Sequence, residues 1–537
     1  MQTKFVVVLG SLMSGLGKGV VTSSILKILD YYDYHVFPVK FDGYLNYDCG
    51  TMNPYRHGEV FVLDDKSELD MDFGMYERFL EKDLKGEFSI TGGKVFGLVT
   101  SKERRGDYLG EDVQIIPHLT NEIISNIEQI SSRNKLDVLV IEVGGTVGDI
   151  ENNYFIEAMR QLSLKHKVVF VNLTYVPEIG PSSEQKSKPT QLAFRSLMQL
   201  GIKPQLLVCR SEKKLDQKVR KKLALFTNLN IENIIDDQNT RSIYELPLNL
   251  LSQNFDKLLL KELGLGGRKI NKKKLSKFKE RVAKITNPPK DTVKIAIVGK
   301  YTELQDSYAS VKEAIIHAAA NQNLGTEIAW INSEHINGKN AKNVLFGMDG
   351  IIIPGGFGGR GIDGMIDAIQ YSREKNIPCL GICLGMQAMA IEFARNVCMI
   401  KGATSSEFDK NARHKVIDIM VSQKGIERKG GTMRLGAWKC KIKSKDTIAY
   451  RAYGSNIISE RHRHRYELNN KYARALERKG LIISGTTTDG KLVEIIEWKN
   501  GFGIGTQAHP ELKSRLSNPA PLFTSLIKAA HKRAQEK

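Results

Sequence analysis

The sequence predicts an α/β protein with two domains, and three observations lead to that class. The chain has 537 residues, which is too long for a single hydrophobic core. Apolar runs of strand length alternate with helical stretches, a pattern typical of a parallel sheet covered on both faces. The alternation is interrupted by a strongly basic stretch and then resumes. We therefore predict one domain over residues 1–267, a basic linker over 268–290 and a second domain over 291–537.

Apolar runs mark the expected strands of both sheets. In the first half they lie at residues 4–10, 35–42, 136–145, 166–176 and 205–209. In the second half they lie at residues 291–301, 349–358 and 376–387. Ligands of open parallel sheets bind at the carboxyl ends of the strands, so we expect the functional residues of each half to follow these runs.

Composition narrows the class of protein. The net charge is +19, and the linker alone, with ten Lys or Arg and one acid, Glu280, supplies +9 of it. The linker has few aromatic residues and no nucleic-acid-reading motif, so we interpret it as a solvated helix and expect no nucleic-acid partner. No apolar run approaches the roughly 20 residues of a membrane span. Neither a signal peptide nor paired cysteine spacing is present, so we expect a cytoplasmic enzyme with reduced thiols and no membrane partner.

The first expected strand leads into the glycine-rich turn "SGLGKG", residues 14–19. It lacks the first glycine and the hydroxyl residue of a standard phosphate loop. It nevertheless has amides free of Cβ obstruction, the cation of Lys18, and a helix N-terminus starting near Val20. The residues predict a nucleotide phosphate site, and an empty strand-to-helix turn is the alternative.

The second half carries a candidate thiol nucleophile. "GICLG", residues 381–385, places Cys383 between two glycines at a strand-to-helix turn, where a helix N-terminus stabilises a thiolate. A base is available in "QAHPEL", because His509 and Glu511 point to the same side of an extended segment. The glycine-rich "PGGFGGRG", residues 354–361, can present amides to an oxyanion. These residues predict acyl transfer through a cysteine.

These motifs resemble a class I glutamine amidotransferase, which hydrolyses glutamine through a cysteinyl thioester and releases ammonia. The resemblance implies a catalytic triad of Cys383, His509 and Glu511. It also implies that glutamine is bound by Gly356, Cys383, Leu384, Gly385, Gln387, Glu407 and Arg465. Around the His-Pro-Glu sequence this chain has Ala508 and Leu512 where that family commonly has phenylalanine.

The first half is similar to the synthetase domain of the CTP synthase family. The matching segments run in order and include "HGEVFVLDD" (57–65), "LDMDFGMYERF" (69–79), "KERRGDYLGEDVQIIPH" (102–118), "EVGGTVGDIE" (142–151) and "KSKPTQ" (186–191). The resemblance covers nearly the whole chain. It implies a Rossmann-like, P-loop-type synthetase domain followed by a class I glutamine amidotransferase α/β domain.

That resemblance also assigns the nucleotide sites. ATP is expected at Gly15, Leu16, Gly17, Lys18, Gly19, Val20, Lys40 and Asp72, with Mg²⁺ bound by Asp72 and Glu142. UTP, or the product CTP, is expected at Ser14, Asp149, Ile150, Glu151, Lys186, Ser187, Lys188, Pro189, Thr190, Gln191 and Lys222.

The implied reaction is the last step of de novo CTP formation, in which ATP phosphorylates O4 of UTP and ammonia from glutamine displaces the phosphate. GTP is the expected activator, to which Arg360 is a candidate contributor, and CTP the expected inhibitor. The expected assembly is a homotetramer, with filaments as a further possible state. Two alternatives stay open at this point: a corrin-amidating synthetase with the same two domain types, and a nucleotide-binding scaffold without turnover.

Overall fold

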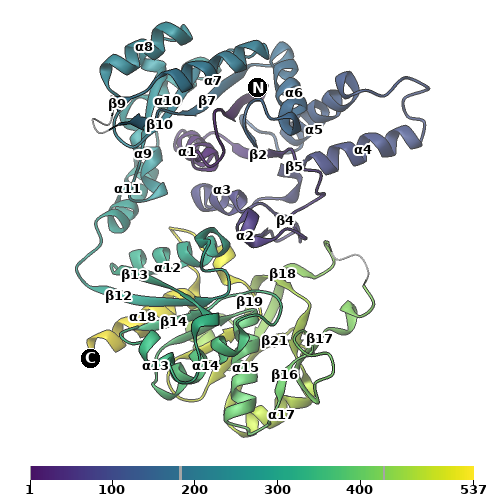
Figure 1. The fold of residues 1–537 in the computed structure, drawn as a ribbon, viewed down its shortest axis with the longest axis vertical. Helices are drawn as coiled ribbons and strands as arrows, with labels where there is room; N and C mark the ends of the chain where they lie inside the picture. The colour runs from purple at the N-terminus through teal and green to yellow at the C-terminus, as the bar shows by residue number, and fades with distance from the viewer. Residues whose placement is uncertain (1, 181–183, 427–429, 537) are drawn as a thin grey trace. The chain divides into compact units, whose positions relative to one another are not determined.

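The computed structural model describes residues 2–180, 184–426 and 430–536 (Figure 1). The chain forms two compact units. The first contains Met1–Asp48 and Met75–Val282, and the second contains Cys49–Gly74 and Ala283–Lys537. Both are α/β units built around a twisted sheet, so the predicted fold class is confirmed.

The first unit has a seven-stranded sheet in which every pair is parallel. Its strand order is β11 (Ile234–Gln238), β10 (Leu206–Ser211), β7 (Val168–Tyr175), β1 (Lys4–Gly10), β6 (Val138–Val143), β2 (Val36–Asp42) and β5 (Ser89–Thr91). The five predicted strands are all present. The short edge strands β5 and β11 were missed: β5 has only three residues, and three of the five side chains of β11, "IIDDQ", are charged or polar.

Helices cover both faces of this sheet, and α1 and α7 lie on opposite sides of its strands (Figure 1). The helices of the unit are α1 (Lys18–Tyr31), α4 (Gly92–Arg104), α5 (Thr120–Arg133), α6 (Asn153–Lys165), α7 (Lys188–Gln199), α8 (Gln217–Thr227), α9 (Leu246–Ser252), α10 (Phe255–Leu263) and α11 (Lys272–Thr286). The hairpin β8 (Glu178–Ile179) and β9 (Glu184–Gln185) precedes α7. Within the described residues, no helix has the length and apolar character that crossing a bilayer requires.

The basic linker forms the predicted helix, α11, but this helix is not fully solvated. Its Phe278 and Val282 are buried. Lys274 forms ion pairs with Asp30 at 3.1 Å and with Asp33 at 2.8 Å at the end of α1. The helix therefore packs one face on the first unit and exposes lysines on the other.

The second unit has a nine-stranded mixed sheet. Its order is β13 (Gly325–Asn332), β12 (Thr292–Gly299), β14 (Gly350–Ile353), β15 (Cys379–Ile382), β23 (Gly503–Thr506), β22 (Val493–Trp498), β21 (Leu481–Thr487), β18 (Arg434–Ile442) and β19 (Ile457–His464). The first five strands are parallel, and the remaining ones are antiparallel. A small sheet of β16 (Ala403–Ser405), β17 (His414–Ile419) and β20 (Tyr466–Leu468) lies apart from it.

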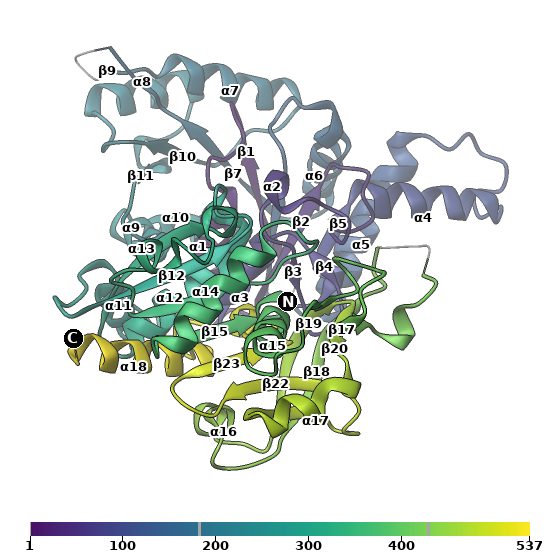
Figure 2. The same cartoon turned by 60° about the horizontal axis from the view of Figure 1, so that its bottom comes forward.

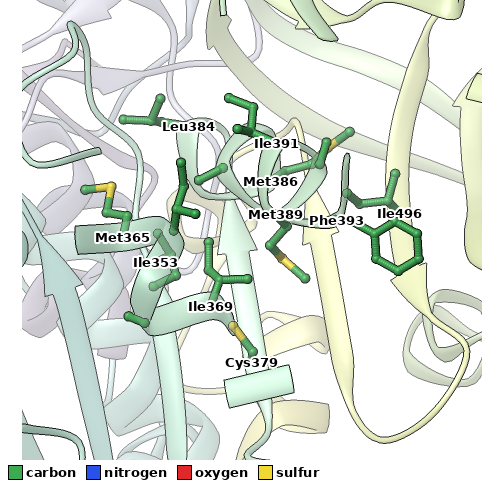
Figure 3. Close-up of a cluster of buried hydrophobic side chains, with 14 of the residues drawn as sticks. Ile353, Met365, Ile369, Cys379, Leu384, Met386, Met389, Ile391, Phe393 and Ile496 are labelled. Atoms are coloured by element: carbon green, nitrogen blue, oxygen red, sulfur yellow. The ribbon is translucent and has the colours of Figure 1, made fainter. Parts of the chain in front are cut away.

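The two faces of β12 pack into two separate cores, as period-2 alternation requires. Val293, Ile295 and Ile297 belong to the core beneath α12 (Ala309–Asn321) and α18 (Pro521–Gln535). Ala296 and Val298 belong to the other core, which contains side chains of α14 (Ile362–Glu374) and α15 (Leu384–Asn396) (Figure 3). Figure 2 shows α15 beside β23. The smaller helices of this half are α13 (Ala341–Val344), α16 (Ile448–Tyr453) and α17 (Asn470–Arg478).

A segment from early in the sequence, residues 49–74, also belongs to the second unit. It contains α2 (Pro54–His57) and the hairpin formed by β3 (Phe61–Val62) and β4 (Glu68–Leu69). The helix α3 (Asp72–Leu80) begins within it and continues into the first unit. Nothing in the local sequence pattern indicates this assignment, because it depends on partners nearly 400 residues away.

Candidate active sites

The cysteine turn has the geometry of a strained nucleophile elbow. Cys383 follows β15 with φ 51° and ψ −102°, a region that non-glycine residues rarely adopt, and α15 begins at the next residue. Its N–H donates to the Thr506 carbonyl at 2.7 Å. The flanking glycines are required by packing, since a Cβ at Gly385 would lie 2.0 Å from the Ile353 carbonyl oxygen. The fold therefore presents this one side chain at the tip of the strand.

The candidate base, His509, is held by the candidate carboxylate. Nδ1 of His509 and Oε1 of Glu511 are 2.7 Å apart. Burial would lower the pKa of His509, but the charges of Glu511 and Cys383 together raise this pKa to about 10. The buried Nε2 has no hydrogen-bond partner among the described residues. Glu511 thus orients the imidazole through Nδ1, and Cys383 acts on the same ring, as expected for a nucleophile and its base.

The conformation around this pair differs from the predicted extended segment. A short 3₁₀ turn spans Pro510–Lys513, and His509 caps it. Proline is tolerated at the first position of a helical turn, where its missing N–H would have no partner. Pro510 thus starts the turn that brings Glu511 back to His509. The predicted contact is present, but the extended backbone was wrong.

Cys383 and His509 line one cavity of about 70 Å³. They meet at the glycine-rich loop after β14, because a Cβ at Gly355 would lie 2.9 Å from His509 Cε1 and 3.8 Å from Cys383 Cβ. Gly356 and Glu511 line the same cavity. The structure therefore brings the three candidate catalytic side chains and the glycine loop to one place.

A buried glutamine beside the thiol escaped the sequence analysis. Nε2 of Gln507 donates to Sγ of Cys383 at 3.6 Å, while its Oε1 accepts from Nε2 of Gln387 at 3.2 Å. Gln387 also donates to the Tyr466 carbonyl at 2.9 Å. Gln507 therefore connects the nucleophile to a side chain expected to bind glutamine. Its position two residues before His509 was the only available signal.

Two further predicted glutamine-binding residues, Glu407 and Arg465, both act electrostatically on Tyr466. Burial raises the pKa of the Tyr466 phenol, the charge of Glu407 raises it further, and Arg465 lowers it, so both charges lie close by. Glu407 accepts from the N–H of Gly358 at 2.7 Å. Arg465 donates to Oε1 of Gln423 at 2.6 Å and to Oγ1 of Thr432 at 3.0 Å. Both of these oxygens belong to neutral groups, and the charge of the Glu68 carboxylate also acts on the guanidinium and raises its pKa against the lowering by burial.

Lys300 is a second residue that the sequence analysis missed. It is buried, and burial lowers the pKa of its ammonium group to about 8. Its Nζ donates to the carbonyls of Phe357 and Gly358, the latter in a very short contact. Lys300, at the carboxyl end of β12, thus fixes the glycine-rich loop through these two hydrogen bonds. A lone lysine after a strand gave no signal of this role.

In the first unit, the turn between β1 and α1 is open. Gly15 and Gly17 have φ of 74° and 94°, and a Cβ on either would meet nothing within 4 Å. Lys18 begins α1, and its Nζ donates to the Gly145 carbonyl at 2.6 Å. Leu16, Gly19 and Val20 complete the turn and the first residues of α1, and Ser14 precedes them. The amides and the cation therefore lie at the carboxyl end of β1, where a phosphate is expected.

Two of the predicted ATP and metal residues are strand neighbours. Lys40 on β2 pairs in register with Glu142 on β6, and both are buried. One oxygen of Glu142 accepts from the Tyr76 hydroxyl at 2.5 Å. Nζ of Lys40 lies 3.7 Å from Asp42. Asp72, the first residue of α3, belongs to the second unit.

Most of the predicted UTP residues lie at the starts of helical elements, whereas Lys222 lies within α8. Asp149 accepts from the Thr146 N–H at 2.9 Å and caps a short turn that contains Ile150 and Glu151. The segment Lys186, Ser187, Lys188, Pro189, Thr190 and Gln191 forms the start of α7, and Lys222 lies on α8. Lys186 pairs with Glu184 at 2.7 Å, and Lys222 also lowers the pKa of that acid. The basic cluster thus contains one carboxylate that the motif did not indicate.

Comparison with known proteins covers both halves. Residues 4–265 match the family described as CTP synthase N-terminus, and residues 303–529 match glutamine amidotransferase class-I. A CTP synthase of Caldanaerobacter subterraneus subsp. tengcongensis is 47% identical over 98% of both chains. That of Pyrococcus furiosus is 48% identical over 100% of this chain and 99% of its own. That of Methanocaldococcus jannaschii is 46% identical over 98% of both.

These relatives, all named CTP synthase, match 98% to 100% of this chain and therefore both of its units. The alternative of a corrin-amidating synthetase is therefore excluded. The six cysteines all lie in the part of the chain that the structure describes and form no disulfide there, and one of them, Cys383, occupies the elbow. The chain therefore belongs to the CTP synthase family, the glutamine-hydrolysing enzymes that aminate UTP to CTP at the expense of ATP.

Proposed function

We propose that Cys383, His509 and Glu511 release ammonia from glutamine and that the turn at residues 14–20 binds the ATP that activates UTP. The observation that carries this proposal is the strained Cys383 elbow facing an imidazole whose Nε2 has no partner among the described residues. Glu511 fixes the tautomer and orientation of that imidazole through Nδ1.

The glutamine step follows from this arrangement. The Cys383 thiolate attacks the side-chain carbonyl carbon of glutamine, and amides near Gly356 and Leu384 stabilise the oxyanion. The His509 imidazolium then gives its proton to the leaving nitrogen, so ammonia departs and a thioester remains. Water, deprotonated by the same imidazole, hydrolyses the thioester to glutamate and restores the thiol. Gln387, Glu407 and Arg465 hold the amino and carboxylate groups of the substrate.

The synthetase step uses the other unit. Lys18 and Lys40 neutralise ATP oxygens, and the amides of the open turn hold the phosphates. Asp72 and Glu142 would hold Mg²⁺, which prefers one or two carboxylates together with phosphates and water, and the Tyr76 bond fixes the Glu142 carboxylate for this task. Mg²⁺, when bound, supplies positive charge that screens the phosphate oxygens. The γ-phosphoryl group moves to O4 of UTP, and ammonia replaces the resulting phosphate at C4.

Family membership supports a proposal for the remaining ligands. UTP, and CTP as a competing product, bind at Asp149, Ile150, Glu151, the start of α7 and Lys222. GTP activates glutamine hydrolysis, with Arg360 as one contributor, and its guanidinium already stacks over Tyr55 at 5.3 Å. The enzyme assembles as a homotetramer and works in the cytoplasm.

A sheltered route for ammonia is part of the same proposal. Ammonia that reaches water at neutral pH becomes ammonium, which has no lone pair for the attack on UTP. Pro54 and Val60 line the cavity beside Cys383, and both come from the segment 49–74. This segment therefore forms part of the wall of the route by which ammonia leaves the thiol.

The decisive experiment is an assay of the purified protein with UTP, ATP, Mg²⁺ and glutamine, followed by the ultraviolet absorbance change of the pyrimidine. We expect CTP to form with glutamine or with ammonium salts as nitrogen donor. Cys383→Ala should lose the glutamine-dependent reaction and keep the ammonium-dependent one. Lys18→Ala should lose both. Retention of turnover by Lys18→Ala would contradict the assignment of the ATP site.

A further inference from the structure

Two carboxylates of the segment 49–74 contact the strand that supports the catalytic thiol and imidazole. The segment lies within the synthetase family match, residues 4–265, and outside the amidotransferase match, residues 303–529. In the structure it nevertheless belongs to the second unit. Its hairpin places Asp64 and Glu68 against β19.

The first contact is an ion pair with a fully buried arginine. Oδ1 of Asp64 lies 2.6 Å from Nε of Arg461, whose side chain is 0% exposed, and Oδ2 lies 3.2 Å from Nζ of Lys513. Burial alone would raise the pKa of Asp64, but the two cations hold it below its ordinary value. The Asp64 carbonyl also accepts from the N–H of Ala437 at 3.1 Å. Asp64 is thus an ionised counter-charge for Arg461.

The second contact repeats the arrangement two residues further along β19. Oε1 of the buried Glu68 accepts from Nε of Arg463 at 2.8 Å, and Oε2 accepts from the N–H of Gly431 at 3.3 Å. Arg463 also donates to the Gly50 carbonyl at 3.1 Å. The same segment therefore holds both arginines, through two side chains and one main-chain oxygen.

The main chain of these arginines contacts the catalytic pair. The carbonyl of Arg461 accepts from the N–H of His509 at 2.7 Å. The carbonyl of Arg463 accepts from Sγ of Cys383 at 3.7 Å. A shift of β19 at these two residues therefore moves the base, the nucleophile or both.

We propose that Asp64 and Glu68 are positioning residues for glutamine hydrolysis, which act through Arg461 and Arg463 on the His509 and Cys383 contacts of β19. The proposal rests on the proposed function of that pair. It means that the amidotransferase chemistry depends on a segment that belongs in sequence to the synthetase half. The same segment contains Asp72, a candidate ligand of the metal that accompanies ATP. Geometric errors of about 1 Å in a catalytic site cost about 10²-fold in rate, so a small displacement suffices for a large effect.

Asp64 offers the sharper test, because Glu68 also lies near Arg465, a glutamine-binding candidate whose pKa is lowered by burial and raised by the charge of Glu68. In the full-length enzyme, Asp64→Asn should lower kcat for glutamine hydrolysis by about 10- to 100-fold with an unchanged KM for glutamine. The rate at which iodoacetamide alkylates Cys383 should fall in parallel. Asp64→Glu, which keeps the charge, should recover most of both rates. Ammonium-dependent CTP formation should stay at the level of the unmodified enzyme.

The matched control is Glu392→Gln, which removes the carboxylate of another buried ion pair in the same unit, with Arg373 at 2.7 Å, away from β19. It should lower the melting temperature and leave kcat and the alkylation rate intact. Equal kcat values for Asp64→Asn and Glu392→Gln would overturn the positioning role. The proposed function would be contradicted by a different result, namely CTP formation from glutamine by the Cys383→Ala variant.

Discussion

Both units contain a strand, a glycine-bracketed turn and a helix, but they use glycine for opposite reasons. At Gly15 and Gly17 the backbone has positive φ and empty space around each missing Cβ. At Gly381 a Cβ would lie 2.7 Å from the carbonyl carbon of Gly385, and at Gly385 it would lie 2.0 Å from the carbonyl oxygen of Ile353. The open turn leaves room for a phosphate, whereas the closed turn fixes one side chain. A glycine pattern alone therefore does not distinguish a binding loop from a nucleophile elbow.

The largest expected effect separates the chemistry of the two turns. Glu511→Gln should reduce kcat with glutamine by about 10⁴-fold, as when a triad loses its carboxylate, and leave ammonium-dependent synthesis unchanged. Stopped assays with each nitrogen donor measure both rates. A comparable loss with ammonium would show that the two turns do not act separately.

The same variant has a defined pH signature. His509 has a folded-state pKa of about 10 against an ordinary 6.5, so its stabilising contribution is complete below pH 6.5 and is lost as pH rises toward 10. Without Glu511 the main cause of this rise is absent. The stability advantage of the unmodified enzyme over Glu511→Gln should therefore shrink between pH 6.5 and 10 in thermal melts. An advantage that grows over this range would contradict the charged pair.

The closed turn should not accept a methyl group. Gly385→Ala should destabilise the second unit by about 3 kcal/mol, because the new Cβ overlaps the Ile353 carbonyl rather than a movable side chain. Urea denaturation measures the change. Gly338→Ala, at a glycine with nothing within 4 Å of its Cβ position, is the control and should change stability little.

The open turn should accept the methyl group at the cost of backbone strain alone. Gly17→Ala should cost about 1–2 kcal/mol of stability because of its positive φ, and it should also raise KM for ATP. Gly267→Ala, at φ 83° with equally open surroundings, should show the same strain without the change in KM. Equal KM values for the two variants would argue against a phosphate at residues 14–20.

The smallest expected effect concerns Gln507, whose side chain donates a hydrogen bond to the thiol of the closed turn. Gln507→Leu should slow alkylation of Cys383 about tenfold, the equivalent of one hydrogen bond. Gln322→Leu removes an amide that donates to the carbonyls of Ala318 and Thr524, and it should leave alkylation unchanged. An unaltered rate in Gln507→Leu would remove this glutamine from the site.

Residues that act through their immediate neighbours in sequence could be predicted. The apolar runs identified the parallel strands β1, β2, β6, β7, β10, β12, β14 and β15, but missed the parallel strands β5, β11, β13 and β23. The glycines around Cys383 identified the elbow, because this signal is also local. The antiparallel strands from β18 to β22 were not predicted, since polar and charged side chains interrupt their apolar pattern. The domain boundaries at 267 and 291 remain a prediction, as do the ligand assignments of the individual site residues.

Residues that act across the fold could not be predicted. Lys300, Gln507 and Asp64 gain their roles from partners that folding brings close, and their sequence neighbours look ordinary. Family resemblance reaches some such positions, for example Glu407 and Arg465, because it carries tertiary information that periodicity lacks. It did not indicate that His509 and Glu511 meet through a 3₁₀ turn.

The placement of residues 49–74 has a practical consequence for dividing the protein. A fragment that starts at residue 291 would keep the elbow, the base and every strand of its sheet, yet it would lack the acids opposite β19. The guanidinium at position 461, wholly enclosed in the intact chain, would then have lost its nearest negative charge. A separate peptide of residues 49–74, added to such a fragment, would supply the missing acids again.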